Sequence, residues 1–105
     1  MYAKTGILIT LALATSLFAE HSEAGKMSYD KACKSCHGAD GTANPAMAKA
    51  LKVEMRHLGS SEVQAQSDAE WKAAITDGKG KMKPVKSVSG AATNDVIAFM
   101  RTLKK

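Results

Sequence analysis

The sequence has little of the material from which a small protein builds a core. Its 105 residues include one Trp, two Tyr and two Phe, and two of these aromatic residues, Tyr2 and Phe18, fall in an N-terminal segment that we expect to be removed. A chain of this length supports one domain and buries only about 60 to 70% of its unfolded surface. The scarcity of large side chains therefore predicts an interior that is filled in part by something other than protein.

Cysteine is equally scarce, since Cys33 and Cys36 are the only two in the chain. They lie in the stretch CKSCH, which offers three ligands at best, whereas a tetrahedral structural zinc site needs four. A thioredoxin-like redox pair follows a strand, and no strand pattern precedes Cys33. A disulfide beside an incidental histidine stays open as the plain alternative.

Long hydrophobic runs are absent except for GILITLALATSLF near the N-terminus, which is too short to cross a bilayer comfortably. The run follows a single positive charge in MYAK and precedes small and polar residues, which is the layout of a secretory signal peptide. We expect this peptide to occupy residues 1–24, with cleavage after Ala19 or Ala24, and the domain to occupy residues 25–105. We therefore expect the protein to be exported to the bacterial periplasm. The alternatives are a buried helix of the domain and an uncleaved membrane anchor.

The spacing within CKSCH suits one particular ligand. A helical turn places Cys33 and Cys36 on one side and rotates His37 by about 100° from Cys36, so one small metal ion is poorly placed to bind all three. A wide planar ligand has no such difficulty, because the two sulfurs can bond to the edge of a porphyrin while the imidazole turns over its face to the iron. For this reason C-x-x-C-H predicts the attachment of one c-type haem.

The longer stretch CKSCHGADGTANPAMAKAL resembles the haem-binding start of a small class I cytochrome c. The resemblance implies an all-α fold of about four helices wrapped around one haem c, with thioethers from Cys33 and Cys36 and with His37 as the proximal iron ligand. It also implies that a proline carbonyl, here that of Pro45, accepts a hydrogen bond from the imidazole. Alternatively, Pro45 occupies the first position of a helix with Asn44 as its N-cap, and both roles are compatible.

The second axial ligand is sought among the methionines. Met82 lies in TDGKGKMKPV, where two glycines and a proline predict a loop. The other methionines of the domain fall in patterns typical of a core or of a terminal helix: Met27, Met47, Met55 and Met100. In the family the sixth ligand comes from a comparable loop, so the resemblance implies Met82. Many family members have proline directly after this methionine, whereas here Lys83 precedes Pro84.

Helices are predicted on both sides of the Met82 loop. Ser67 and Glu70 form an S-x-x-E capping box, and Gly78 suits the C-terminal cap of the helix that follows. The final segment ATNDVIAFMRTLKK predicts a helix capped by Thr93 or Asn94.

The resemblance implies that this last helix crosses the N-terminal one through Gly25, Tyr29 and Phe99. The region from Val53 to Ser67 is the least informative. Its apolar spacing predicts a helix that continues from Pro45 to Leu58, but the resemblance favours a shorter helix followed by irregular chain.

Electron transfer is the function that these features favour. If both axial positions are filled, the iron has no vacant site at which to activate a substrate, and methionine opposite histidine favours the reduced state. We therefore expect a single-electron carrier of a respiratory chain and not an enzyme. One alternative is a haem-based gas- or peroxide-reactive protein in which Met82 is displaced or never bound. A nonredox module held by a disulfide leaves His37 and Met82 unexplained.

Trp71 has two possible roles. In related cytochromes a tryptophan near this position donates its indole N–H to a haem propionate, which makes Trp71 a candidate cofactor-binding residue. The alternative is a core aromatic that packs on the last helix. Both are compatible with the need of a buried indole for an acceptor.

The charge of the chain suggests a partner. The formal net charge is +5, and no acidic residue lies between Asp77 and Asp95. This interval and the haem motif hold the lysines that we expect to surround the exposed haem edge: Lys34, Lys79, Lys81, Lys83 and Lys86. They predict docking of transient, acidic redox proteins by a monomer, and a solvated charge run is the alternative. Nucleic acid is disfavoured as a partner because the basic residues are nearly all Lys without interleaved aromatics. We also expect no stable membrane insertion after cleavage of the signal peptide.

Overall fold

The computed structural model describes residues 19–105, which form helices joined by loops. A helix covers residues 19–32, and five further helices follow: α2 (Lys34–His37), α3 (Pro45–Leu51), α4 (Ser61–Gln64), α5 (Asp68–Asp77) and α6 (Ala91–Arg101). The described residues contain no strand, and a single isolated bridge pairs Lys79 with Met82. The all-α expectation is therefore confirmed. Most of the expected signal peptide falls on residues 1–18 and lies outside the described part.

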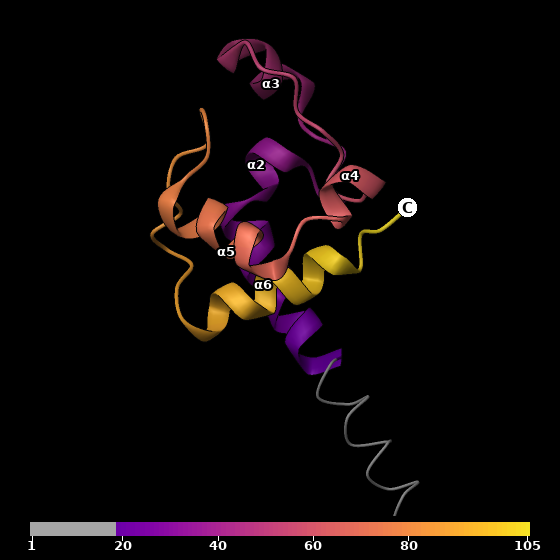
Figure 1. Cartoon of the computed structure of the whole chain (residues 1–105), viewed down its shortest axis with the longest axis vertical. Coiled ribbons are helices and arrows are strands. Elements are labelled where there is room, and N and C mark those ends of the chain that lie inside the picture. Colours follow the sequence, from indigo (N-terminus) through magenta and orange to yellow (C-terminus); the bar gives the residue numbers. More distant parts are fainter. Residues whose placement is uncertain (1–18) are drawn as a thin grey trace, which may run out of the picture.

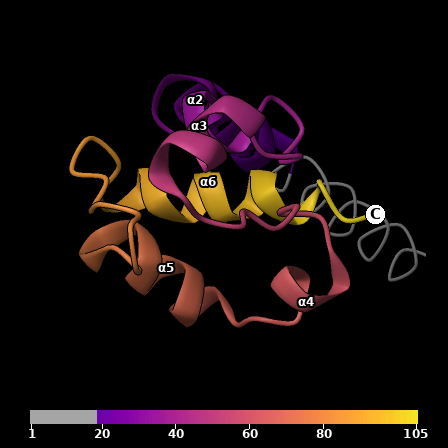
Figure 2. The same cartoon turned by 90° about the horizontal axis from the view of Figure 1, so that it is seen from above.

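The helices are arranged around α6. Figure 1 shows α6 crossing the helix of residues 19–32, with α5 beside it. Seen from above in Figure 2, α6 lies between α2 and α3 on one side and α4 and α5 on the other. α6 therefore lies at the centre of this arrangement, where it packs against α5 and the helix of residues 19–32 and accepts a hydrogen bond from Gln64 of α4.

The crossing of the N-terminal helix and α6 depends on a glycine and two aromatic rings. A Cβ atom at Gly25 would collide with the carbonyl oxygen of Asp95, so only glycine permits this approach of the two backbones. Beside it, the rings of Tyr29 and Phe99 pack with centroids 5.1 Å apart and planes tilted by 56°. The expected crossing through Gly25, Tyr29 and Phe99 is confirmed.

Three of the expected helix caps are present. The Asn44 side chain accepts from the backbone N–H groups of Ala46 and Met47, and Pro45 follows as the first helical residue. Ser67 and Glu70 form both halves of the capping box of α5, which ends at Gly78.

The cap expected for α6 was wrong, because this helix starts at Ala91 after Gly90, and no side chain caps it. Thr93 instead lies inside the helix with 3% of its surface exposed, so tertiary burial outweighs its preference for a cap.

The helix that starts at Pro45 is the shorter of the two that were expected. α3 ends at Leu51, and Lys52 adopts the left-handed conformation with φ 55° and donates its N–H to the carbonyl of Lys49. Residues 53–60 are irregular, and the short helix α4 then begins after the Ser60 cap. A continuous helix from Pro45 to Leu58 is excluded.

The core within the described residues is thin, as the composition predicts. Only two large side chains, Tyr29 and Val96, have less than 2% of their surface exposed. The remaining buried apolar residues are supplied chiefly by α5 and α6: Cys33, Leu58, Trp71, Ile75, Val88, Ile97, Phe99 and Met100. Neither α2 nor α3 contributes a buried residue. Among residues 19–105 no helix has the length and apolar character needed to cross a membrane.

Candidate functional site

The two cysteines lie at the start of the single turn of α2 and within it. Cys33 precedes its first residue and is buried, whereas Cys36 lies within it and is half-buried. Both thiols are free. Burial, and secondarily the neighbouring Cys36, raises the pKa of Cys33 to about 11, so this thiol is protonated at neutral pH. The pair is thus presented on one helical turn, with Cys33 as an uncharged thiol.

His37 is the last residue of α2, and its ring lacks a partner. The Nδ1 atom is buried and forms no hydrogen bond within residues 19–105. Burial lowers the pKa of His37, so the imidazole is neutral and retains a lone pair for a metal. A buried polar atom without a partner is rare in a folded protein. This ring is therefore prepared for a group that the protein chain alone does not supply.

The expected hydrogen bond from His37 to Pro45 is not formed. Pro45 is the first residue of α3, and a carbonyl at that position points along the helix axis toward the amide one turn later. The alternative role for Pro45, as the first helical residue after the Asn44 cap, is the one that the structure contains.

The backbone around His37 is held by hydrogen bonds from the loop that follows. Ala43 donates its N–H to the carbonyl of His37, and Asn44 donates its N–H to the carbonyl of Cys36, both at 2.8 Å. The Asn44 side chain reaches the carbonyl of Ser35 at 3.0 Å. Asn44 therefore joins the haem motif to the start of α3 in addition to capping that helix.

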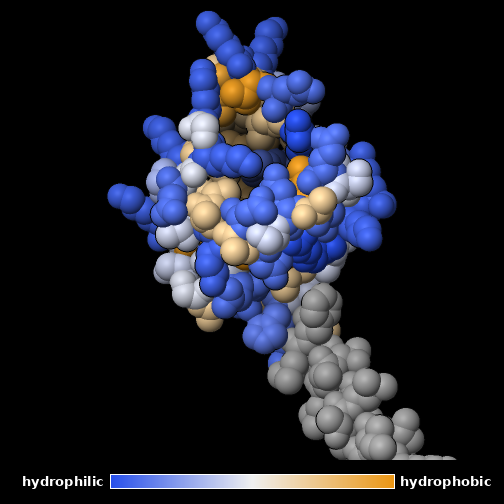
Figure 3. Space-filling model, in the orientation of Figure 1, coloured by the Kyte–Doolittle hydropathy of each residue, from blue (hydrophilic) through white to orange (hydrophobic). Residues whose placement is uncertain are grey.

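An apolar surface without protein cover lies near this turn. Figure 3 shows a hollow with hydrophobic residues at its edge, below the end of the molecule that α3 forms in Figure 1. α3 has no buried residue, and the apolar side chains in and after it are all partly exposed: Met47, Leu51, Val53 and Met55. Two thiols, an unpartnered imidazole and an uncovered apolar surface fit a haem.

Met82 lies in the loop between α5 and α6. The backbones of Lys79 and Met82 exchange two hydrogen bonds of 2.9 Å, which close the loop into a tight turn. Gly78 has φ 83°, and a Cβ there would come within 2.7 Å of the Met82 carbonyl oxygen, so glycine is needed for the turn to close. The Met82 side chain is half-buried. The expected loop presentation of Met82 is present.

The lysines of the expected collar are all exposed: Lys34, Lys79, Lys81, Lys83 and Lys86. The ion pairs found among residues 19–105 involve other groups, so these five ammonium groups are not neutralised by neighbouring carboxylates.

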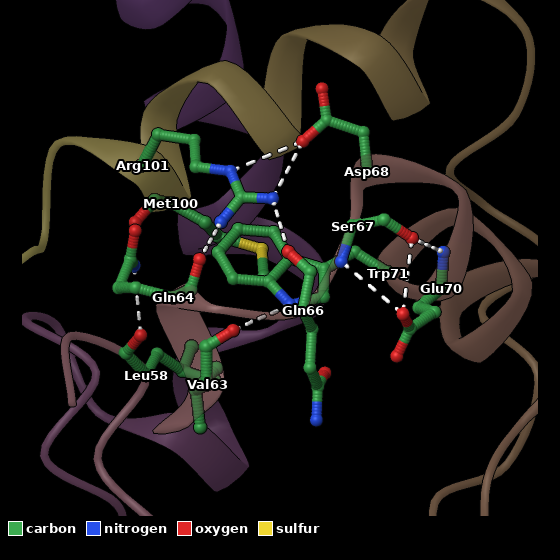
Figure 4. A network of polar contacts seen from close by, with 10 residues as sticks. All are labelled: Leu58, Val63, Gln64, Gln66, Ser67, Asp68, Glu70, Trp71, Met100 and Arg101. Carbon is green, nitrogen blue, oxygen red and sulfur yellow. Dashed lines mark hydrogen bonds and ion pairs between the residues drawn. The ribbon is translucent and has the colours of Figure 1, made fainter. Parts of the chain in front are cut away.

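The indole of Trp71 is engaged by protein on two sides. Its Nε1–H donates to the carbonyl of Val63 at 3.2 Å, and the guanidinium of Arg101 stacks on the ring at 3.8 Å from the centroid. Figure 4 shows this arrangement. The indole N–H that would bond to a propionate is already bonded to Val63, and Trp71 has only 3% of its surface exposed. The structure favours the packing alternative for Trp71.

Sequence analysis missed Arg101, which anchors the segment between α4 and α5. Its Nη1 and Nη2 donate to the carbonyls of Gln64 and Gln66, both at 2.7 Å, and its Nε and Nη2 donate to Asp68 (Figure 4). The available signal was an arginine at the end of the last helix, close to Lys104 and Lys105, since arginine alone carries a fork of donors.

Comparison with known proteins agrees with the haem motif. The family model described as cytochrome c matches residues 22–104. Among solved structures, the KustC0563 c-type cytochrome is 28% identical with a TM-score of 0.65, and the match covers 77% of this chain and 98% of that chain. A search of curated proteins finds no match. The protein belongs to the cytochrome c family, whose members transfer electrons through a covalently bound haem, and Cys33 and Cys36 are the cysteines that hold it.

Proposed function

We propose that this cytochrome is an exported, single-electron carrier of the bacterial periplasm whose haem iron is bound axially by His37 and Met82. The haem supplies the redox centre, an iron that cycles between two oxidation states. The chain supplies its attachment through the two thiols, its axial ligands and its cover from water. When both axial positions are occupied, electrons pass through the haem edge and no substrate reaches the iron.

The observation that carries the proposal is the state of the His37 ring. The imidazole is neutral, its Nδ1 is buried without a partner among residues 19–105, and its backbone is held by Ala43. A metal-binding histidine has to be deprotonated at its ligating nitrogen and fixed in orientation. His37 meets the first condition directly after the second attachment cysteine, and the hydrogen bond from Ala43 fixes the backbone that carries its ring.

Met82 is supported by the construction of its loop. The turn from Gly78 to Met82 is closed by backbone hydrogen bonds, and Val85 donates its N–H to the carbonyl of Ile75 at 2.8 Å, which ties the loop back to α5. A ligand on a fixed loop is positioned at low entropic cost. The other methionines among residues 19–105 lie in helices or in the irregular segment after α3, whereas Met82 lies in the loop between α5 and α6.

The ligation is tested by replacing Met82 with Ala in the haem-loaded protein. We expect the covalent haem to be retained and the reduced protein to bind carbon monoxide readily, because the sixth position is then open. Met27→Ala is the control, since Met27 is an exposed methionine of the N-terminal helix and is not part of the apolar surface near the haem motif. Rapid carbon monoxide binding by the unmodified protein would instead support the gas-reactive alternative.

The exposed lysines support a docking surface for an acidic redox partner. Lys79, Lys81 and Lys83 surround Met82, and Lys34 lies inside the haem motif, so their charge is near the site through which electrons leave. Long-range attraction then accelerates encounter, and salt suppresses it as the screening length falls from about 30 Å at 0.01 M to about 10 Å at 0.1 M.

Docking is tested by the bimolecular electron-transfer rate to an acidic acceptor as a function of ionic strength. A variant with Lys79, Lys81 and Lys83 changed to Gln should lose most of the salt dependence. A control with Lys49, Lys52 and Lys72, also exposed, changed to Gln removes equal charge elsewhere. Equal salt slopes in the two variants would contradict docking at the Met82 loop and leave the haem assignment intact.

A further inference from the structure

The fully buried Tyr29 has a hydroxyl group that the crossing of the terminal helices does not require. Its ring packs on Phe99, and phenylalanine would serve that contact equally well. The hydroxyl points away from this pair and donates to the carbonyl of Gly38 at 2.6 Å. A buried hydroxyl is costly unless it is bonded, so this single contact has to offset its removal from water.

Gly38 is the residue directly after the expected iron ligand. It ends α2 with φ 79° and ψ 163°, and its N–H donates to the carbonyl of Lys34 at 2.8 Å. The peptide group that follows it marks the point at which the chain turns from α2 into the loop of residues 39–44. The orientation of this turn sets the direction in which the His37 side chain leaves the backbone.

Successive carbonyls around His37 are held by three different donors. Those of Cys36 and His37 accept from the backbone of Asn44 and Ala43, which belong to the same loop and move with it. The carbonyl of Gly38 accepts from Tyr29, which belongs to the N-terminal helix. Gly41 also approaches the Gly38 carbonyl, but at 3.4 Å this contact is long and comes from the loop itself. Tyr29 is therefore the side chain that fixes the turn to the packed core.

We propose that Tyr29 is a positioning residue of the redox site, whose hydroxyl orients His37 by anchoring the Gly38 carbonyl to the crossing of the terminal helices. The inference rests on the proposed ligation by His37. It adds a hydrogen bond through which the N-terminal helix holds the turn directly after the iron ligand. Burial raises the pKa of Tyr29, so the hydroxyl is a neutral donor at neutral pH.

The test is Tyr29→Phe in the haem-loaded protein, because this change removes one oxygen and keeps the ring. We expect the reduction potential to fall, since an unpaired carbonyl beside His37 admits water, and water stabilises the more highly charged ferric iron. We also expect faster hydrogen exchange at the amides of Gly38 and Ala43, which report on the turn without reference to redox activity.

Phe99→Leu is the matched control, because it loosens the same helix crossing and leaves the hydrogen bond to Gly38 in place. The proposal requires that Tyr29→Phe shifts the potential and that Phe99→Leu, at an equal or larger loss of thermal stability, does not. An equal shift in both variants would show that the potential follows stability alone and would overturn the proposal. So would an unchanged potential in Tyr29→Phe.

A measurement on the unmodified protein applies if Tyr29→Phe fails to retain haem. The Tyr29 hydroxyl proton should exchange slowly enough to appear in the proton NMR spectrum of the reduced protein and should show a cross-peak to Gly38. A rapidly exchanging hydroxyl would overturn the anchor. If His37 does not bind the iron, the absorption spectrum of the unmodified protein will show it, and the Tyr29 hydroxyl signal will still be present. That result would contradict the proposed ligation and not the hydrogen bond to Gly38.

Discussion

Arg101→Ala should destabilise the protein without altering its redox site. The guanidinium of Arg101 holds the carbonyls of Gln64 and Gln66 and covers the face of Trp71 (Figure 4). Its removal leaves two carbonyls of the connection between α4 and α5 without their donor and exposes the indole ring to water. The affected groups belong to the packing of α5 on α6 and lie apart from CKSCH in the sequence.

The size of the effect follows from these contacts. A hydrogen bond to a charged group contributes about 1.5–3 kcal/mol, and the lower end applies here because the Arg101 side chain is 27% exposed. Stacking on Trp71 adds about 0.5–1 kcal/mol. The ion pair with Asp68 adds less than about 1 kcal/mol, since the carboxylate side chain is 71% exposed. We expect a total loss of about 3 kcal/mol, after allowing for water that reaches the carbonyls.

Urea unfolding of the haem-loaded protein, followed by far-UV circular dichroism, measures this loss. Arg101→Lys keeps the charge but not the fork of donors, so it should lose most of the same free energy of unfolding. Asp68→Asn removes only the ion pair and should cost less than about 1 kcal/mol. If Asp68→Asn were as destabilising as Arg101→Ala, the ion pair and not the carbonyl contacts would be the main contribution, and the reasoning would be refuted.

Other substitutions test the remaining contacts. Trp71→Phe should leave the reduction potential and its pH dependence unchanged while lowering the free energy of unfolding by about 0.5–1.5 kcal/mol, because the hydrogen bond from the indole to the Val63 carbonyl is lost; a shifted potential would restore the propionate role. Gly25→Ala should lower that free energy by at least about 1–3 kcal/mol, since its Cβ overlaps the Asp95 carbonyl, and thermal unfolding equal to wild type would contradict the close crossing. The side-chain and then the backbone hydrogen bond from Thr42 lower the pKa of Asp40. Thr42→Val should therefore raise that pKa in an NMR titration, and the stability difference from wild type should be constant at neutral pH and vanish as the pH falls through the folded pKa of Asp40.

Local patterns predicted the parts of this protein whose geometry is itself local. The spacing of CKSCH depends on one helical turn, the Asn44 and Ser67 caps depend on backbone groups two or three residues away, and Gly78 depends on its own φ. The crossing of the terminal helices is not local. It was predicted through family resemblance, because no periodicity within either helix specifies the residue at which the other one crosses.

Sequence reasoning failed where a side chain found its partner far along the chain. Thr93 looked like a cap but is buried inside α6, and the sequence did not decide between a propionate and a core role for Trp71, whose indole donates to the Val63 carbonyl. Arg101 contacts carbonyls more than thirty residues earlier, which no local pattern indicates. The Met82 loop was predicted from glycine and proline, but whether its sulfur binds iron depends on a group that the sequence does not contain.

The crossing of the first and last helices also has a consequence for the timing of biosynthesis. Gly25 and Tyr29 pack on Asp95 and Phe99, each of which lies seventy residues further along the sequence. A chain that is synthesised from its N-terminus cannot form these contacts until α6 has been made. During that interval Cys33 lacks the neighbours that bury it in the folded protein. The order of the elements along the chain therefore leaves Cys33 accessible for haem attachment until α6 closes the fold.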